Sequence, residues 1–230
     1  ITAAAMPHRP WAVSISVAAL PGDLPRLYEF SAETYADLFA LDVAAIVEGD
    51  PAYDDHLRTD PLYLVCTNGK RDRCCALHGM ALADALTAQA GDAVWQTTHL
   101  GGHRFAATLL SLPDGVCYGR LVPADAAEFT NHHQRGALWL EKMRGFTGYA
   151  AIVQLAEIAL RRATGRLDRL HFRHTETIQV DDGWQVGFVD VARRPFTVTL
   201  APAEPLSLTA SCGSAKIKSI PQYQVVDIKQ

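Results

Sequence analysis

The amino-acid sequence predicts an α/β protein, in which a small mixed sheet carries helices on its faces and further strands follow from the C-terminal region. Between residues 62 and 98 a short apolar run, an Ala- and Leu-rich segment and a second β-branched run succeed one another, which indicates a β-α-β unit. Residues 106–121 have the turn chemistry of a β-hairpin, and residues 170–200 contain strand-like segments separated by turns. With 230 residues, 49% of them apolar, the chain is long enough to bury a hydrophobic core.

The first 60 residues are expected to form an extension that packs on the core. Trp11–Val17 alternates as a strand does and is ended by Pro21-Gly22. Ser31 is placed to cap a short helix that includes Leu38 and Phe39. The polar residues 49–60, which precede Pro61, indicate a linker into the next unit.

The core is expected between residues 61 and 165. In chain order the segments are a buried strand over Leu62–Val65, a helix over Leu77–Ala90, a strand over Val94–Thr98, a hairpin over 106–121 and helices over 124–134 and 149–164. The last helix has an apolar face opposite Glu157, Arg161 and Arg162. This β-α-β-β-β-α order fits a thioredoxin-like arrangement of layers.

After Asp168 the pattern changes to strands. Residues 170–180, 184–191 and 196–200 are separated by Asp-Asp-Gly and Arg-Arg-Pro turns. From Ala201 onward prolines and small residues favour a tail over the surface, with 223–228 as a candidate last strand. Residues 166–230 are therefore expected to be a β extension and tail within one compact unit.

Composition excludes several classes of function. A net charge of -4 gives no electrostatic support for nucleic-acid binding, and no apolar run reaches the length of about 18 residues that a membrane span needs. The five cysteines are an odd number for a secreted disulfide scaffold, and the N-terminus lacks the layout of a signal peptide. We therefore expect a protein of the reducing cytoplasm, where clustered cysteines more often bind metal or are redox-active.

Chemistry is concentrated in two short loops, Cys66 to Cys75 and His99 to His103. Two thiolates and two imidazoles restrict the candidates to a tetrahedral zinc ion or a [2Fe-2S] cluster with two histidines on one iron. Gly101-Gly102 favours a loop over a helix between the histidines, and glycines allow close approach to a bulky cluster. The cysteine loop is longer than zinc loops usually are, which favours a cluster.

The adjacent thiols of Cys74 and Cys75 leave a choice, because only one is expected to bind the same iron. Cys75 is favoured, since it borders the helix and the helix N-terminus stabilises a thiolate. Cys74 remains the alternative.

The string from Leu64 to Ala76, Leu-Val-Cys-Thr-Asn-Gly-Lys-Arg-Asp-Arg-Cys-Cys-Ala, together with His-Leu-Gly-Gly-His-Arg-Phe-Ala over His99–Ala106, resembles the sucrase/ferredoxin-like family. The resemblance runs from about Pro21 to Gly165, with support from residues 112–115, 118–121 and 154–157. It implies a thioredoxin-like [2Fe-2S] ferredoxin of the His-x3-His subgroup, in which the cluster ligands match Cys66, Cys75, His99 and His103. Asn68 departs from the family pattern, since many relatives carry His there.

The expected function is electron transfer to or from a protein partner, a reductase or an electron acceptor, rather than self-contained catalysis. Protonation of the ligating imidazoles would make the reduction potential fall as pH rises. Lys70, Arg71, Arg73 and Arg104 lie beside the ligands and would suit an acidic electron donor. A zinc-stabilised binding module and, with less support, a thiol-disulfide oxidoreductase are the alternatives.

Overall fold

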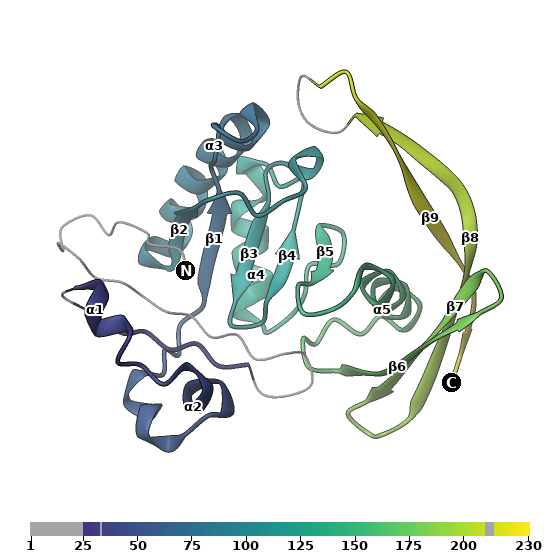
Figure 1. The fold of residues 1–230 in the computed structure, drawn as a ribbon, viewed down its shortest axis with the longest axis horizontal. Helices are drawn as coiled ribbons and strands as arrows, with labels where there is room; N and C mark the ends of the chain where they lie inside the picture. The colour runs from purple at the N-terminus through teal and green to yellow at the C-terminus, as the bar shows by residue number, and fades with distance from the viewer. Residues whose placement is uncertain (1–24, 33, 210–213) are drawn as a thin grey trace.

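The computed structural model describes residues 25–32, 34–209 and 214–230, which form two separate sheets (Figure 1). The first sheet has five strands in the order β2-β1-β3-β4-β5. Its first pair is parallel and the other pairs are antiparallel. The strands are β1 (Leu62–Cys66), β2 (Val94–Thr97), β3 (Leu109–Leu112), β4 (Val116–Tyr118) and β5 (Met143–Phe146). The mixed, thioredoxin-like sheet predicted from the sequence is therefore confirmed.

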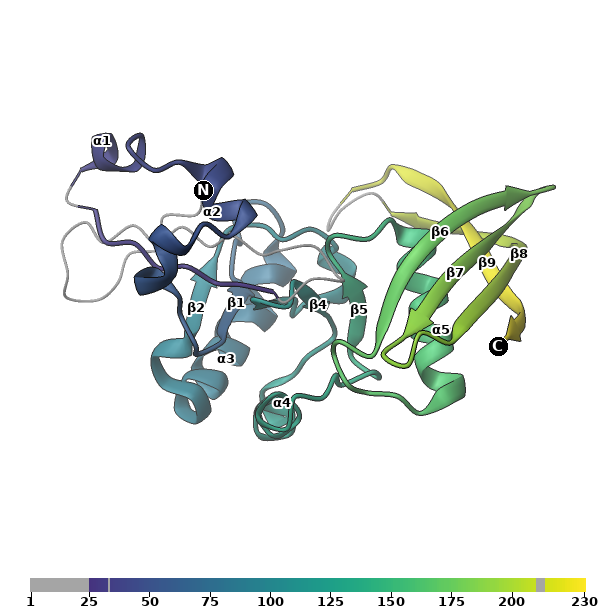
Figure 2. The ribbon, with the colours of Figure 1, turned by 90° about the horizontal axis from the view of Figure 1, so that it is seen from below.

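Helices α3 (Arg73–Ala90) and α4 (Ala126–Gln134) lie on the same side of this sheet (Figure 2). Alternation along β1 decides which side chains meet them, because successive strand residues point to opposite faces. Tyr63 and Val65 join the main core with the helices, whereas Leu62 packs with Leu27 on the other face. Short 3-10 turns over 91–93 and 123–125 precede β2 and α4.

The N-terminal extension contains more structure than the sequence predicts. Helix α1 spans Tyr35–Leu38 and begins after Thr34, whose N–H donates to the Asp37 carboxylate at 2.8 Å, so the expected cap at Ser31 is wrong. Helix α2 (Val43–Glu48) was not expected, and the expected linker contains a 3-10 helix over Pro51–His56. The strand expected over 11–17 lies outside the described residues.

Helix α5 (Ala151–Thr164) lies between strand β5 and the second sheet (Figure 1). That sheet is antiparallel, with β6 (Phe172–Val180), β7 (Gly183–Asp190), β8 (Pro195–Thr209) and β9 (Ile217–Lys229) in sequence order. The apolar face of α5 packs against the side chains of β6, β7 and β8 in a second core. The additional C-terminal strands predicted from the sequence are confirmed.

The expected surface tail after Ala201 is wrong, because β8 continues to Thr209 and pairs with β9 as a long two-stranded ribbon (Figure 1). Pro202 and Pro205 are the residues that made the strand seem to end early. Strand β7 pairs with β8 only as far as Leu200, so the prolines fall where β8 has lost that neighbour. Proline is tolerated at such a free edge and at bulges, and the register shifts between Ala203 and Leu206.

Strand β5 was also missed from the sequence, because it is four residues long and contains Gly145.

None of the helices in the described part of the chain has both the length and the apolar character that crossing a membrane requires.

Candidate metal centre

Two thiols that lie close together come from the end of β1 and the first turn of α3. Cys66 is the last residue of β1, and α3 begins at Arg73, four residues before the start predicted from the sequence. Both Cys66 and Cys75 are 1% exposed. Gly79 allows this packing, because a Cβ there would lie 2.1 Å from the carbonyl oxygen of Cys66. The close contact of helix and strand brings the two sulfurs together.

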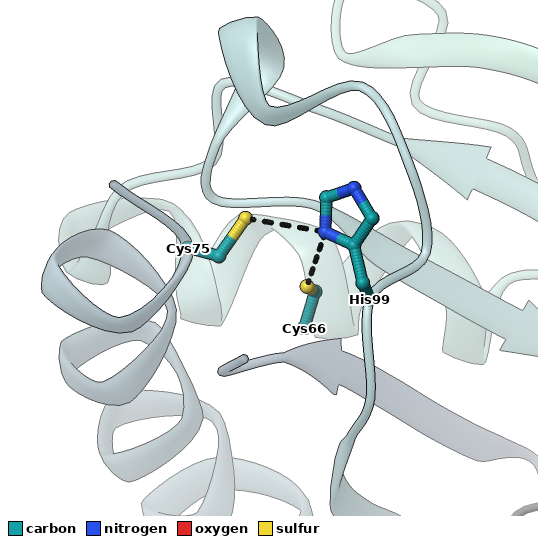
Figure 3. A group of neighbouring side chains, drawn as sticks. All are labelled: Cys66, Cys75 and His99. Carbon is teal, nitrogen blue, oxygen red and sulfur yellow. Dashed lines mark hydrogen bonds between the residues drawn. The ribbon is translucent and has the colours of Figure 1, made fainter. Parts of the chain in front are cut away.

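His99 reaches the thiols from the neighbouring strand. Strands β1 and β2 are parallel, and Cys66 pairs with Thr97, the last residue of β2. Because parallel strands end at the same edge of a sheet, the loop after Thr97 starts beside Cys66. The Nδ1 of His99 lies 3.7 Å from the Sγ of Cys75 and 4.0 Å from the Sγ of Cys66 (Figure 3). These three donor atoms all lie within 4.8 Å of one another.

His103 lies next to this group and is connected to it through Asp72. The buried Asp72 carboxylate has its Oδ2 3.5 Å from the Nδ1 of His103 and 3.9 Å from the Nε2 of His99. His103 is not one of the three donors that converge within 4.8 Å. The four residues selected from the sequence therefore lie in one region, as a compact group of three with His103 beside it.

Sequence reasoning missed Asp72. The residue precedes α3 at the N-cap position, where an Asp side chain normally accepts a hydrogen bond from the helix. Here the side chain makes no such bond and lies against the histidines instead. An acidic residue directly before a cysteine-bearing helix was the available signal, but such a residue ordinarily indicates a helix cap.

Cys74 is oriented differently from Cys75. Its Sγ lies 3.5 Å from the backbone oxygen of His103, to which it donates. Cys75, and not Cys74, belongs to the group of three donors. Adjacent residues on a helix point about 100° apart, so the second thiol faces the histidine loop when the first faces Cys66.

The histidine loop packs against Arg144, which was not identified from the sequence. Gly101 and Gly102 have φ values of +84° and +69°, in the left-handed region that glycine favours. A Cβ at Gly102 would lie 2.7 Å from the guanidinium of Arg144. That guanidinium also lies 4.6 Å from the Phe105 ring centroid and donates to the Sγ of Cys117 at 3.6 Å. Arg144 belongs to β5, the strand that the sequence did not reveal.

Burial and a neighbouring sulfur keep the thiol of Cys75 protonated in the metal-free protein. Burial, followed by the neighbouring Cys66, raises the pKa of Cys75 to about 12. Burial also raises the pKa of Cys117, while Arg144 acts in the opposite direction. Since thiolate is the metal-binding form, an ion or cluster must displace the proton of Cys75 when it binds.

The donor set fits a thiophilic metal group. Two sulfurs and an imidazole nitrogen suit zinc and iron-sulfur centres, and a carboxylate beside ligating histidines orients their rings. A further unpaired donor lies in the same loop: the Nε of Arg104 is buried and has no hydrogen-bond partner among the described residues. These residues together could hold a negatively charged group that also accepts hydrogen bonds.

Comparison with known proteins adds the following similarities. The family model described as Sucrase/ferredoxin-like matches residues 7–145. A curated relative, "Altered inheritance of mitochondria protein 32" of Meyerozyma guilliermondii, is 31% identical over 103 residues. That match covers 40% of this chain. It covers 36% of the relative, so this chain spans only about a third of the length of that relative.

Among solved structures, a thioredoxin-like [2Fe-2S] ferredoxin from Aquifex aeolicus is 16% identical, covering 37% of this chain and 90% of its own, with a TM-score of 0.34. A cysteine-to-serine variant of that ferredoxin is 19% identical, covering 36% of this chain and 96% of its own, with a TM-score of 0.32.

Proposed function

This chain belongs to the Sucrase/ferredoxin-like family, and we propose that it is an electron-transfer protein in which Cys66, Cys75, His99 and His103 hold a [2Fe-2S] cluster. The observation that carries the proposal is the convergence of two buried thiols and an imidazole, with a second histidine beside them. A [2Fe-2S] cluster, when bound, accepts and releases one electron. The proposed protein partner is a reductase or an electron acceptor.

The residues around the site have distinct roles in this proposal. Cys66 and Cys75, which are buried, would hold the inner iron, and His99 and His103 the outer iron. Asp72, whose Oδ2 lies beside both imidazole rings, would orient them. The side chain of His99 is 23% exposed, so the histidine side is the one through which an electron would enter or leave.

Histidine ligands also connect the reduction potential to pH. Replacing thiolate by neutral imidazole removes negative charge from one iron and raises the potential. Each imidazole has a second nitrogen that can hold a proton, and reduction favours protonation there. We expect the potential to fall as pH rises through the histidine pKa of the oxidised form. A potential that stays flat from mildly acidic to strongly alkaline pH would contradict this coupling.

The direct experiment is the absorption spectrum of protein purified without oxygen, together with iron, sulfide and zinc analysis. We expect a brown protein with about two iron and two acid-labile sulfide per chain. Replacing His99 or His103 with Cys should retain the cluster and lower its potential. An unchanged potential would count against ligation by the replaced residue.

A structural zinc site is the second candidate, and one observation favours it. The donor atoms of Cys66, Cys75 and His99 lie within 4.8 Å of one another, a compact group that suits a single ion. A colourless protein with one zinc per chain would establish it. Thiol-disulfide exchange has less support, because a thiol whose pKa is about 12 supplies little nucleophilic thiolate near neutral pH.

A further inference from the structure

Beside the candidate centre, the chain presents a small surface with three cations at the start of α3 and two exposed apolar side chains on the turns that follow. We call it the α3 patch, and it consists of Lys70, Arg71, Arg73, Leu77 and Met80. Arg73, Leu77 and Met80 are spaced by four and three residues, which places them on one outward stripe of α3. Leu77 is 72% exposed and Met80 is 43% exposed. Two exposed apolar side chains thus follow three exposed cations on the outward side of a helix that buries its opposite face.

The cations of the α3 patch form no ion pair in the described part of the chain. Lys70, Arg71 and Arg73 are exposed, and no carboxylate of the described residues lies within 4.0 Å of any of them. The acidic residue among them in the sequence, Asp72, is buried against the histidines. The whole chain, by contrast, carries a net charge of -4. The α3 patch is therefore positive on a protein that is negative overall.

The α3 patch also adjoins the more exposed side of the candidate centre. Cys74, which follows Arg73, donates to the backbone oxygen of His103 at 3.5 Å, so the first turn of α3 touches the histidine loop. His99 in that loop has a side chain 23% exposed, whereas both thiols of the donor group are buried. A protein seated on the α3 patch would thus lie against the least buried part of the centre.

We propose that the α3 patch is the docking surface for an acidic one-electron redox protein, an inference that rests on the proposed function and names the kind of partner. Carboxylates on the partner would face Lys70, Arg71 and Arg73, while Leu77 and Met80 would contact an apolar centre. Short-lived redox complexes use small interfaces, in which complementary charge speeds encounter and a few apolar contacts give the complex its lifetime.

The first experiment measures the sign of the local charge with small redox ions. Reduced protein that contains its cluster gives one electron to hexacyanoferrate(III), which becomes hexacyanoferrate(II), or to the cationic tris(phenanthroline)cobalt(III), which becomes cobalt(II). Rates are compared at about 10 mM and about 150 mM NaCl, where the Debye length is about 30 Å and about 8 Å. We expect added salt to slow the anionic oxidant and to speed the cationic one. The net charge of the whole chain predicts the opposite, and that result would overturn the proposal.

A charge-matched pair of variants localises the effect. Lys70→Glu/Arg71→Glu should slow the anionic oxidant about tenfold at low salt and reverse its salt dependence. Arg162→Glu/Arg173→Glu makes the same change in net charge at exposed positions on α5 and β6, and should change the rate less than about twofold. Equal effects from the two variants would contradict docking at the α3 patch.

The second experiment measures binding without electron transfer. Calorimetric titration with oxidised cytochrome b5, which is rich in carboxylates, should give a salt-sensitive complex, and the lysine-rich cytochrome c should give none. Leu77→Ser should weaken the complex severalfold at either salt concentration, while Leu206→Ser, at an exposed position on β8, should not. Binding of cytochrome c instead, or self-association through Leu77, would overturn the proposal.

The two proposals fail in different ways. A protein without iron and sulfide refutes the cluster, but its binding to cytochrome b5 can still be measured. A protein that contains the cluster yet shows no salt-sensitive preference for acidic partners refutes the docking surface alone.

Discussion

The carboxylate of Asp72 lies 3.5 Å from the Nδ1 of His103 and so joins the cysteine loop to the histidine loop. The same oxygen is 3.9 Å from the Nε2 of His99. One buried acid therefore contacts both histidines, while the Nδ1 of His99 faces the thiols. A carboxylate that accepts from an imidazole N–H fixes the ring and its tautomer. We therefore expect Asp72, which was not identified from the sequence, to orient both histidines.

Replacement of Asp72 by Asn should weaken metal binding without unfolding α3. The side chain makes no capping hydrogen bond, so the helix loses little, but the imidazoles lose their anionic neighbour. We expect about 10- to 100-fold lower metal affinity, measured by chelator competition. Asp84→Asn, at an exposed position on the same helix, is the control. Equal affinities for the two variants would exclude an orienting role for Asp72.

Serine substitutions should separate the two adjacent cysteines. The Sγ of Cys75 lies 3.7 Å from the His99 imidazole, whereas Cys74 donates to the backbone of His103. We expect the iron content of Cys75→Ser to be about tenfold lower than that of the wild-type protein, and its visible absorption to be lost. Cys74→Ser should be close to wild type in both iron content and absorption. The measurement is iron content and absorption per chain. The reverse order would make Cys74 the ligand.

Alanine at Gly79 should destabilise the protein, although alanine is the better helix residue. Alanine gains about 1 kcal/mol in helix propensity over glycine. Its Cβ, however, would lie 2.1 Å from the carbonyl oxygen of Cys66, and that backbone atom can move only if β1 or α3 shifts. Overpacking of this kind costs about 1–3 kcal/mol. We expect a net loss, read from urea unfolding.

The control for this substitution is Ala81→Gly, at an exposed position, which reports helix propensity alone. A Gly79→Ala protein that is more stable than wild type would show that the contact between α3 and β1 is loose.

The buried His133 should make the protein sensitive to acid. Burial lowers its pKa to about 3 from an ordinary value of 6.5. Between these values the unfolded chain binds a proton that the native protein does not, so the free energy of unfolding rises with pH. The stability that the neutral, buried His133 allows is complete above about pH 6.5. It is lost as pH falls toward 3, at up to about 1.4 kcal/mol of unfolding free energy per pH unit.

His133→Phe should flatten that dependence, because the Phe129 and Tyr118 rings around the site accept an aromatic neighbour. The measurement is urea unfolding at a series of pH values from about 4 to 7. The exposed His78, replaced by Gln, should leave the slope unchanged. Identical slopes for wild type and His133→Phe would show that His133 titrates normally in the native protein.

Local patterns in the sequence were sufficient for much of the fold and for the donors. The apolar run before Cys66 and the Ala-rich segment after Cys75 predicted β1 and most of α3, since strand and helix periods differ. The Pro-Asp-Gly turn that ends at Gly115 predicted the β3-β4 hairpin. Donor chemistry selected Cys66, Cys75, His99 and His103, because soft ligands clustered in loops are typical of metal and cluster sites.

Other features depend on neighbours that are distant in the chain. The periodicity of α5 placed Glu157 and Arg161 on a polar face, as if solvated. In the structure both are buried as an ion pair at 2.8 Å, and Arg161 also donates to the backbone oxygen of Asp168 at 2.7 Å. A helix between two sheets buries more of its circumference than its own sequence reveals.

By itself the sequence determined most of the elements around the site and which residues carry soft donor atoms, because periodicity and side-chain chemistry are local properties. The tertiary structure alone decided that Asp72 turns from its helix to the histidines, that Arg144 supports Gly102, and that a proline-containing tail is a strand. Each of these depends on what the chain places beside a residue in space, and a contact between distant segments leaves no periodic pattern in either of them.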